Sequence, residues 1–214
     1  MNRLRVALIA LCLSLSALPA SAAQSRSGLP QFRGQWQPEV GSGGVYQLEQ
    51  KGQPAMTWEV AVVGQEAGGY WIENRMNAPQ EMIAKMLLTT SGPQRFIVKT
   101  AGQPAMELPV MQAAQGFPET DLQKKAKLVG KEQVTTPAGT FSCDHYRLEE
   151  QGGTDVWVAG TVSPYGLVKL SSKNTTMTLS KVVKGAKTRI TETPQKLEIP
   201  KMPGLAEMMG RRKE

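Results

Sequence analysis

Cys143 and His145 are the residues whose types and spacing could support covalent chemistry. They stand two positions apart in an expected β-strand, so they would share one face of a sheet. A thiol beside an imidazole can form a nucleophile–base pair or supply two metal ligands. A nucleophilic site also needs a group that orients the base and donors for an oxyanion, and the sequence identifies neither, since Asp144 would point to the other face. We therefore expect Cys143 and His145 to be packing residues and not a catalytic site. An enzyme that uses the Cys143 thiol ranks third among the functions considered.

Metal binding is the next chemistry to consider. His145 is the sole histidine, which excludes a copper site built from one cysteine and two histidines. The chain has 11 methionines, and thioethers bind Cu(I), but the close groups Met106/Met111 and Met208/Met209 lack a nearby histidine or cysteine. Methionine also fills irregular apolar space and adapts to different ligands. We expect core packing, with an adaptable apolar cavity and a copper site as alternatives, and predict no metal and no cofactor.

The first 22 residues have the pattern of a secretory signal peptide. Arg3 and Arg5 precede an apolar run, and Ala20-Ser21-Ala22 fits a cleavage site, so we expect cleavage after Ala22. No later segment approaches the roughly 20 apolar residues of a membrane-spanning helix. The mature protein should therefore be periplasmic, with Cys143 as its single cysteine and no intramolecular disulfide.

The charge balance limits the classes of partner. Loss of Arg3 and Arg5 lowers the formal net charge from +7 to +5. This charge favours mild attraction to anionic membrane surfaces. The lysines and arginines are scattered along the chain, so we predict no nucleic-acid partner; the oligomeric state stays open.

Turn residues and β-type alternation organise the rest of the chain. We expect a flexible segment over 23–43, one antiparallel β domain over 44–193 and a proline-broken tail over 194–214. Within 56–66, Met56, Trp58, Val60 and Val62 alternate and should share one face. Residues 79–90 fit either a short helix or a strand. Short strands at near-regular spacing from 127 onward predict an antiparallel meander.

The pentapeptide Gly-Gln-Pro-Ala-Met occurs twice, at 52–56 and 102–106. Gly52 and Gly102 can adopt positive φ in a turn, and a proline that cannot donate to a ladder belongs at the start of a strand or at a sheet edge. Similarity fades outside the pentapeptide. We therefore predict one turn used twice, and keep a duplicated hairpin and a paired ligand motif as alternatives.

Residues 129–172 carry a longer motif. A V-x-TPAGTF-x-C-x-HY hairpin, followed by WV and PYGLVK, resembles uncharacterised exported bacterial proteins related to the LolA/LolB-like periplasmic lipoprotein-carrier superfamily. The resemblance implies an open, curved antiparallel sheet around an apolar cavity, with helices at the opening and no catalytic residues. Members of known function carry acyl chains or sense envelope components.

Together the meander and the resemblance predict a mainly β protein, with a curved antiparallel meander sheet or half-open barrel and at most one or two short helices. The leading function is non-catalytic binding of a lipid, an acyl chain or a lipoprotein in the concavity. The alternative is a structural or interaction protein of the cell envelope without a ligand cavity. If the cavity exists, its expected lining is Trp58, Val60, Trp71, Met86, Met106, Met111 and Trp157.

Overall fold

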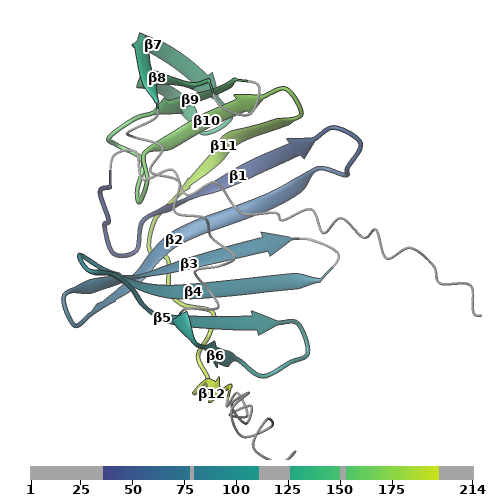
Figure 1. Ribbon diagram of the computed structural model, residues 1–214, viewed down its shortest axis with the longest axis vertical. Helices are drawn as coiled ribbons and strands as arrows, with labels where there is room; N and C mark the ends of the chain where they lie inside the picture. The colour runs from purple at the N-terminus through teal and green to yellow at the C-terminus, as the bar shows by residue number, and fades with distance from the viewer. Residues whose placement is uncertain (1–35, 78–79, 111–125, 150–152, 198–214) are drawn as a thin grey trace, which may run out of the picture.

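The computed structural model describes residues 36–77, 80–110, 126–149 and 153–197 (Figure 1). The signal peptide expected at 1–22, Met111 and residues 198–214 lie outside the described residues. Of the segment expected to be flexible, only residues 36–43 are described. Among residues with described structure, no helix has the length and hydropathy needed to span a bilayer.

Within the described residues, twelve β-strands form one open, curved sheet, which confirms the predicted fold class. Their order across the sheet is β12-β6-β5-β4-β3-β2-β1-β11-β10-β9-β8-β7, so two meanders, β1–β6 and β7–β11, join where β1 pairs with β11 (Figure 1). Every pairing is antiparallel except that of β12 with β6. The strands are β1 Gly43–Gln50, β2 Met56–Glu66, β3 Gly69–Asn77, β4 Glu81–Thr89, β5 Gly92–Thr100, β6 Met106–Leu108, β7 Lys127–Thr136, β8 Gly139–Leu148, β9 Thr154–Val158, β10 Leu167–Ser172, β11 Thr175–Val183 and β12 Gln195–Lys196.

One face of the sheet, here called the inner face, carries the main core. Alternate residues of a strand point to opposite faces, and directly opposed residues share a face. Trp58 lies opposite Tyr46, and Ile72 lies opposite both Val62 and Met86, so the apolar rows continue from strand to strand. Met56, Trp58, Val60 and Val62 belong to one cluster, which confirms the alternation predicted from the sequence.

The β9–β10 loop, residues 159–166, contributes to this core. Val162 and Pro164 are fully buried, and Val162 packs in the same cluster as the inner-face side chains. Trp36 then packs against Tyr165 of the loop and Tyr70 of β3, with ring centroids 5.6 and 6.3 Å apart. Residue 36 is thus docked on the body of the protein.

The opposite face, here called the outer face, is crossed by the segment that links β11 to β12. We call residues 184–194 the strap. Ile190 of the strap is buried in a second apolar cluster with Trp71, Ile83, Leu87 and Ile97. The strap ends at β12, which pairs with β6 at the far edge of the sheet. The first residues of the segment expected as a tail therefore extend the sheet.

The repeated pentapeptide forms the same turn twice. Gln53 N donates to Gln50 O, and Gln103 N donates to Thr100 O, each at 3.0 Å. Gly52 has φ 80° and Gly102 has φ 76°, so both occupy the left-handed region that favours glycine. The prediction of one turn solution used twice is confirmed, in the β1–β2 and β5–β6 hairpins. Residues 79–90, whose sequence fits either a short helix or a strand, contain strand β4.

Candidate functional site

Four of the seven predicted lining residues lie on the inner face. Trp58, Val60 and Met86 belong to the main core cluster, and they are 3%, 0% and 8% exposed. Met106 starts β6 opposite Val98, an inner-face residue of β5. The structure therefore brings these four together on one continuous apolar surface, three of them as core and Met106 at its margin.

Of the other three predicted lining residues, Trp71 lies apart from this surface. Trp71 belongs to the outer-face cluster, where its Nε1 donates to Glu66 Oε2 at 2.9 Å and Lys85 Nζ lies 4.7 Å from the ring centroid. Burial of the Lys85 ammonium lowers its pKa. Trp157 alternates with the buried residues Val156 and Val158 and, half-buried, packs against the main core cluster, while Met111 lies outside the described residues.

A row of methionines borders the inner face at one end of strands β2 to β6. Met76 lies directly opposite Met82, and Met76 also lies opposite Trp58. Met82 is 42% exposed, and Met56, Met76 and Met106 are half-buried. We call these four residues the methionine rim. Met56 and Met106 each end a copy of the repeated pentapeptide, but the pairing with Met76 and Met82 depends on strand register that composition does not reveal.

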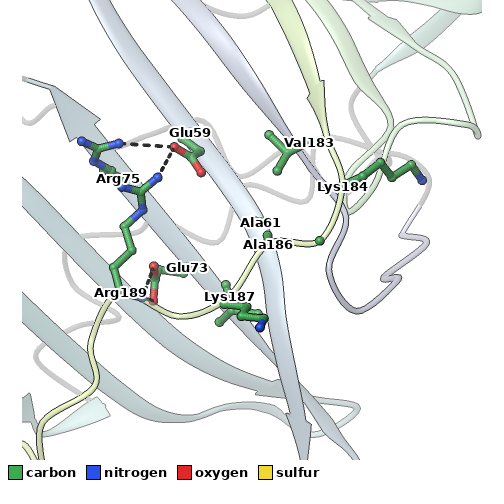
Figure 2. A pocket seen from close by; sticks show the side chains of 11 residues that line it. Glu59, Ala61, Glu73, Arg75, Val183, Lys184, Ala186, Lys187 and Arg189 are labelled. Atoms are coloured by element: carbon green, nitrogen blue, oxygen red, sulfur yellow. Dashed lines mark hydrogen bonds and ion pairs between the residues drawn. The ribbon is translucent and has the colours of Figure 1, made fainter.

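The described residues also form a cleft of about 350 Å³ on the outer face, between strands β2 and β3 and the strap (Figure 2). Its side chains are mainly charged. The Glu59 carboxylate forms ion pairs with Arg75 at 3.6 Å and with Arg189 at 3.3 Å. Lys184 and Lys187 line the side of the cleft that the strap forms. Sequence reasoning missed this cleft because strap and sheet are far apart along the chain.

Two carboxylates hold the strap and the N-terminal segment in place, Glu73 in the cleft and Glu39 beside its lining residue Lys184. Buried Glu73 accepts hydrogen bonds from Thr188 Oγ1 at 2.6 Å and from the backbone N–H of Arg189 at 3.0 Å. Glu39 accepts from Ser42 at 2.9 Å and from Lys184 at 3.4 Å, and these two contacts lower the pKa of its carboxyl group. Because Glu59 already engages the guanidinium groups of Arg75 and Arg189, these described cleft residues offer no free guanidinium pair to an anion.

His145 lies in a polar cluster on β7, β8 and β9. Its Nε2 contacts Asp155 Oδ1 at 2.9 Å and its Nδ1 contacts Glu132 Oε1 at 3.1 Å. The ring stacks on Trp157 with centroids 4.6 Å apart, and Trp157 Nε1 donates to the same Glu132 carboxylate. Both imidazole nitrogens are therefore engaged by carboxylates. No group of three or more His, Cys, Asp or Glu side chains within the described part of the chain could hold a metal ion.

Cys143 is buried in the core instead of presented to solvent. Its Sγ contacts Phe141 O at 3.7 Å. Burial, followed by the nearby carboxylates of Glu132 and Asp144, raises the pKa of the thiol to about 11. A thiolate is the reactive form, so this environment disfavours nucleophilic chemistry.

No family model matches the sequence, and no curated protein matches it either. Among solved structures, a protein assigned as exported with a YmcC-like fold from Bacteroides fragilis aligns with a TM-score of 0.33 and 13% identity, over 70% of this chain and 98% of that chain. A protein assigned as a lipoprotein from Parabacteroides distasonis gives the same TM-score and identity, over 69% and 97%. MucB gives a TM-score of 0.36 at 15% identity, over 70% and 55%, and was also solved in complex with MucA(peri). These values indicate a distant likeness in fold and carry no functional inference.

Proposed function

We propose that this protein is an exported, non-catalytic binding protein that holds a hydrophobic or lipidic ligand against the inner face of its sheet. The observation that carries the proposal is the continuous apolar inner face that reaches the surface at the methionine rim. An exported destination rests on the expected signal peptide, and a net positive charge would favour approach to anionic membrane surfaces.

The physical case rests on what the rim offers to an acyl chain. Each methylene moved from water into an apolar environment contributes about 0.8 kcal/mol. Methionine side chains are unbranched and polarizable, so they can repack around chains of different shape. Met82 is exposed while its opposite neighbour Met76 is half-buried, so the rim is the part of the inner face that a ligand reaches first.

The same geometry argues against a chemical step at Cys143 and His145. The thiol has a raised pKa and contacts a backbone carbonyl, and the imidazole nitrogens face Asp155 and Glu132. A nucleophile–base pair would need the thiol to give its proton to a free ring nitrogen. We therefore propose a binding protein without an active site.

The deciding experiment has two stages. Protein purified from its own envelope is examined by native mass spectrometry, and it should carry bound lipid. After solvent extraction it should bind an environment-sensitive fatty-acid probe saturably, and the probe should raise the melting temperature because it binds the native state. Clean protein together with no saturable probe binding would overturn the proposal.

Matched variants locate the binding surface. Met82→Lys places an ammonium group on the rim and should weaken probe binding by about tenfold, a loss near 1.4 kcal/mol. Met106→Lys should act in the same direction. Val40→Lys is the control, because Val40 is also an exposed apolar residue, at 52%, but lies outside the rim. Equal weakening by all three would mean that probe binding reports net charge instead of the rim.

An interaction protein of the envelope is the second candidate, and a specific observation favours it. Trp58, Val60 and Met86 are already buried, and the cleft formed by the described residues lies on the other face. If the extracted protein binds no probe, the inner face is a filled core, and function then lies on the outer face or at the sheet edges.

A further inference from the structure

Strand β7 forms one edge of the sheet, and β12 and β6 lie at the opposite edge (Figure 1). It is a ten-residue strand that pairs with β8 on one side, and no described strand pairs with its other side. The opposite edge of the sheet ends in β12, which has two residues. Natural sheets usually keep edge strands short or covered, because an open edge presents unpaired backbone groups to another chain.

The direction of the free backbone groups follows from the β7–β8 turn. Thr136 lies opposite Gly139 across a two-residue turn, so this closing pair exchanges hydrogen bonds. Hydrogen-bonded and non-hydrogen-bonded pairs alternate along an antiparallel ladder. The backbone N–H and C=O groups of Lys131, Gln133 and Thr135 therefore point away from β8. Only an extended backbone can satisfy such a row of alternating donors and acceptors.

The side chains of β7 indicate what kind of partner would fit. Leu128 and Val129 are 59% and 58% exposed, and they are large apolar residues next to each other on the edge. Lys127 and Lys131 are exposed and add positive charge, although the Lys131 ammonium also lies 3.6 Å from the Asp144 carboxylate. Glu132 is the one acid of the strand, and its carboxylate is engaged by Trp157 and His145. The edge thus favours apolar and acidic side chains on its partner.

A second copy of this chain is a poor match to the edge. Two antiparallel strands related by a twofold axis must place a residue opposite itself at the centre, because cross-strand neighbours share a face. The two self-pairing registers with the greatest overlap along β7 are centred on Lys131 and on Glu132. They set lysine against lysine or glutamate against glutamate, and like charges directly opposed are destabilising.

We propose that the outer edge of β7 is a binding site for an extended peptide segment of a partner protein, one rich in apolar and acidic residues, which adds a strand to the sheet. The backbone groups of Lys131, Gln133 and Thr135 bind the peptide backbone, and the exposed apolar and basic side chains select its sequence. This site is separate from the methionine rim, so its test does not depend on ligand binding at the inner face.

The test uses the full mature chain and a fluorescein-labelled ten-residue peptide in which valine alternates with threonine and glutamate. Fluorescence anisotropy should show saturable binding to the native protein. Gln133→Pro removes one outward N–H while the β8 ladder stays intact, and proline is tolerated on an edge strand. It should weaken binding by about tenfold, whereas the matched control Gln133→Ala keeps the N–H and should bind as the unchanged protein does.

Two further peptides need no protein variant, so the proposal stays testable if Gln133→Pro folds poorly. A peptide N-methylated at every residue has no backbone donor on either of its edges and should not bind. A peptide with lysine in place of glutamate should bind more weakly. Equal binding of the N-methylated peptide, or no saturable binding up to about 1 mM, would overturn the proposal. So would a dimer in sedimentation analysis that Gln133→Pro dissociates, because the occupant would then be a second copy.

Discussion

The Thr188 hydroxyl donates a 2.6 Å hydrogen bond to the carboxylate of Glu73, which is 5% exposed. The backbone N–H of Arg189 contacts both oxygens of the same carboxylate, at 3.0 and 3.2 Å. A buried carboxylate is costly unless its oxygens are hydrogen-bonded. Glu73 and Thr188 therefore join the strap to the outer face at the point where the strap crosses β3.

Replacing Glu73 should release the strap. Glu73→Leu removes the acceptor of the Arg189 N–H and leaves the Thr188 hydroxyl only its longer contact with Ile190 O, so we expect the free energy of unfolding to fall by about 1–3 kcal/mol. Hydrogen exchange at residues 186–190 should also become faster. Glu59→Gln is the control, because Glu59 forms partly exposed ion pairs that contribute less than about 1 kcal/mol. Unchanged exchange in Glu73→Leu would show that the apolar contact of Ile190 alone holds the strap.

The two pentapeptide turns should respond alike to substitution. Gly52→Val and Gly102→Val put a β-branched residue at positive φ, and each should cost about 1–3 kcal/mol. No atom lies within 4 Å of a Cβ built at either position, so the cost is backbone strain and not a clash. Gly52→Asn is the control, since asparagine tolerates this conformation. Thermal melting measures all three, and a melting temperature unchanged by Gly52→Val would contradict the turn assignment.

Short sequence patterns predicted much of this fold because most paired strands are neighbours in the sequence. The alternation from Met56 to Val62 identified a face, and the repeated pentapeptide identified two turns, since each depends on residues close in sequence. Residues 79–90 stayed ambiguous because apolar side chains at both helical and strand spacing occur there. Pairing with β3 and β5 on both sides decides that β4 is a strand.

The candidate site was harder to predict because it depends on register and on distant contacts. Trp58 and Trp71 look equivalent as aromatic strand residues. The register of β2 against β3 sets Trp58 opposite Met76, and alternation along β3 then places Trp71 on the other face. The pairing of β1 with β11 and the path of the strap join segments more than a hundred residues apart. No local pattern contains that information.

Tyr46 should be a sensitive reporter of the inner-face core. Its buried hydroxyl donates to Leu167 O at 2.9 Å, so Tyr46→Phe should cost about 1–3 kcal/mol by leaving a buried carbonyl without its donor. Burial holds the pKa of Tyr46 well above its ordinary value of 10.0. A pKa raised by folding means that this stabilisation is full below the ordinary value and declines as the pH rises beyond it. Urea melts give the free energy of unfolding of the native protein and of Tyr46→Phe, and the difference between the two should be smaller above pH 10 than at pH 8. A difference that stays constant with pH would contradict the burial argument.

Cys143 should behave as a packing residue in solution. Burial raises the pKa of its thiol from 9.0 to about 11, so roughly one molecule in a thousand carries a thiolate at pH 8. A disulfide reagent should react slowly with the native protein and rapidly after denaturation, and the native rate should climb with pH toward 11. Because folding raises this pKa, the thiol's contribution to stability is full below pH 9 and declines as the pH rises toward 11.

Cys143→Ala should lower the free energy of unfolding by about 1–2 kcal/mol and leave fatty-acid probe binding unchanged. Fast native reaction at pH 7, or lost binding in a variant that melts normally, would instead assign Cys143 a functional role.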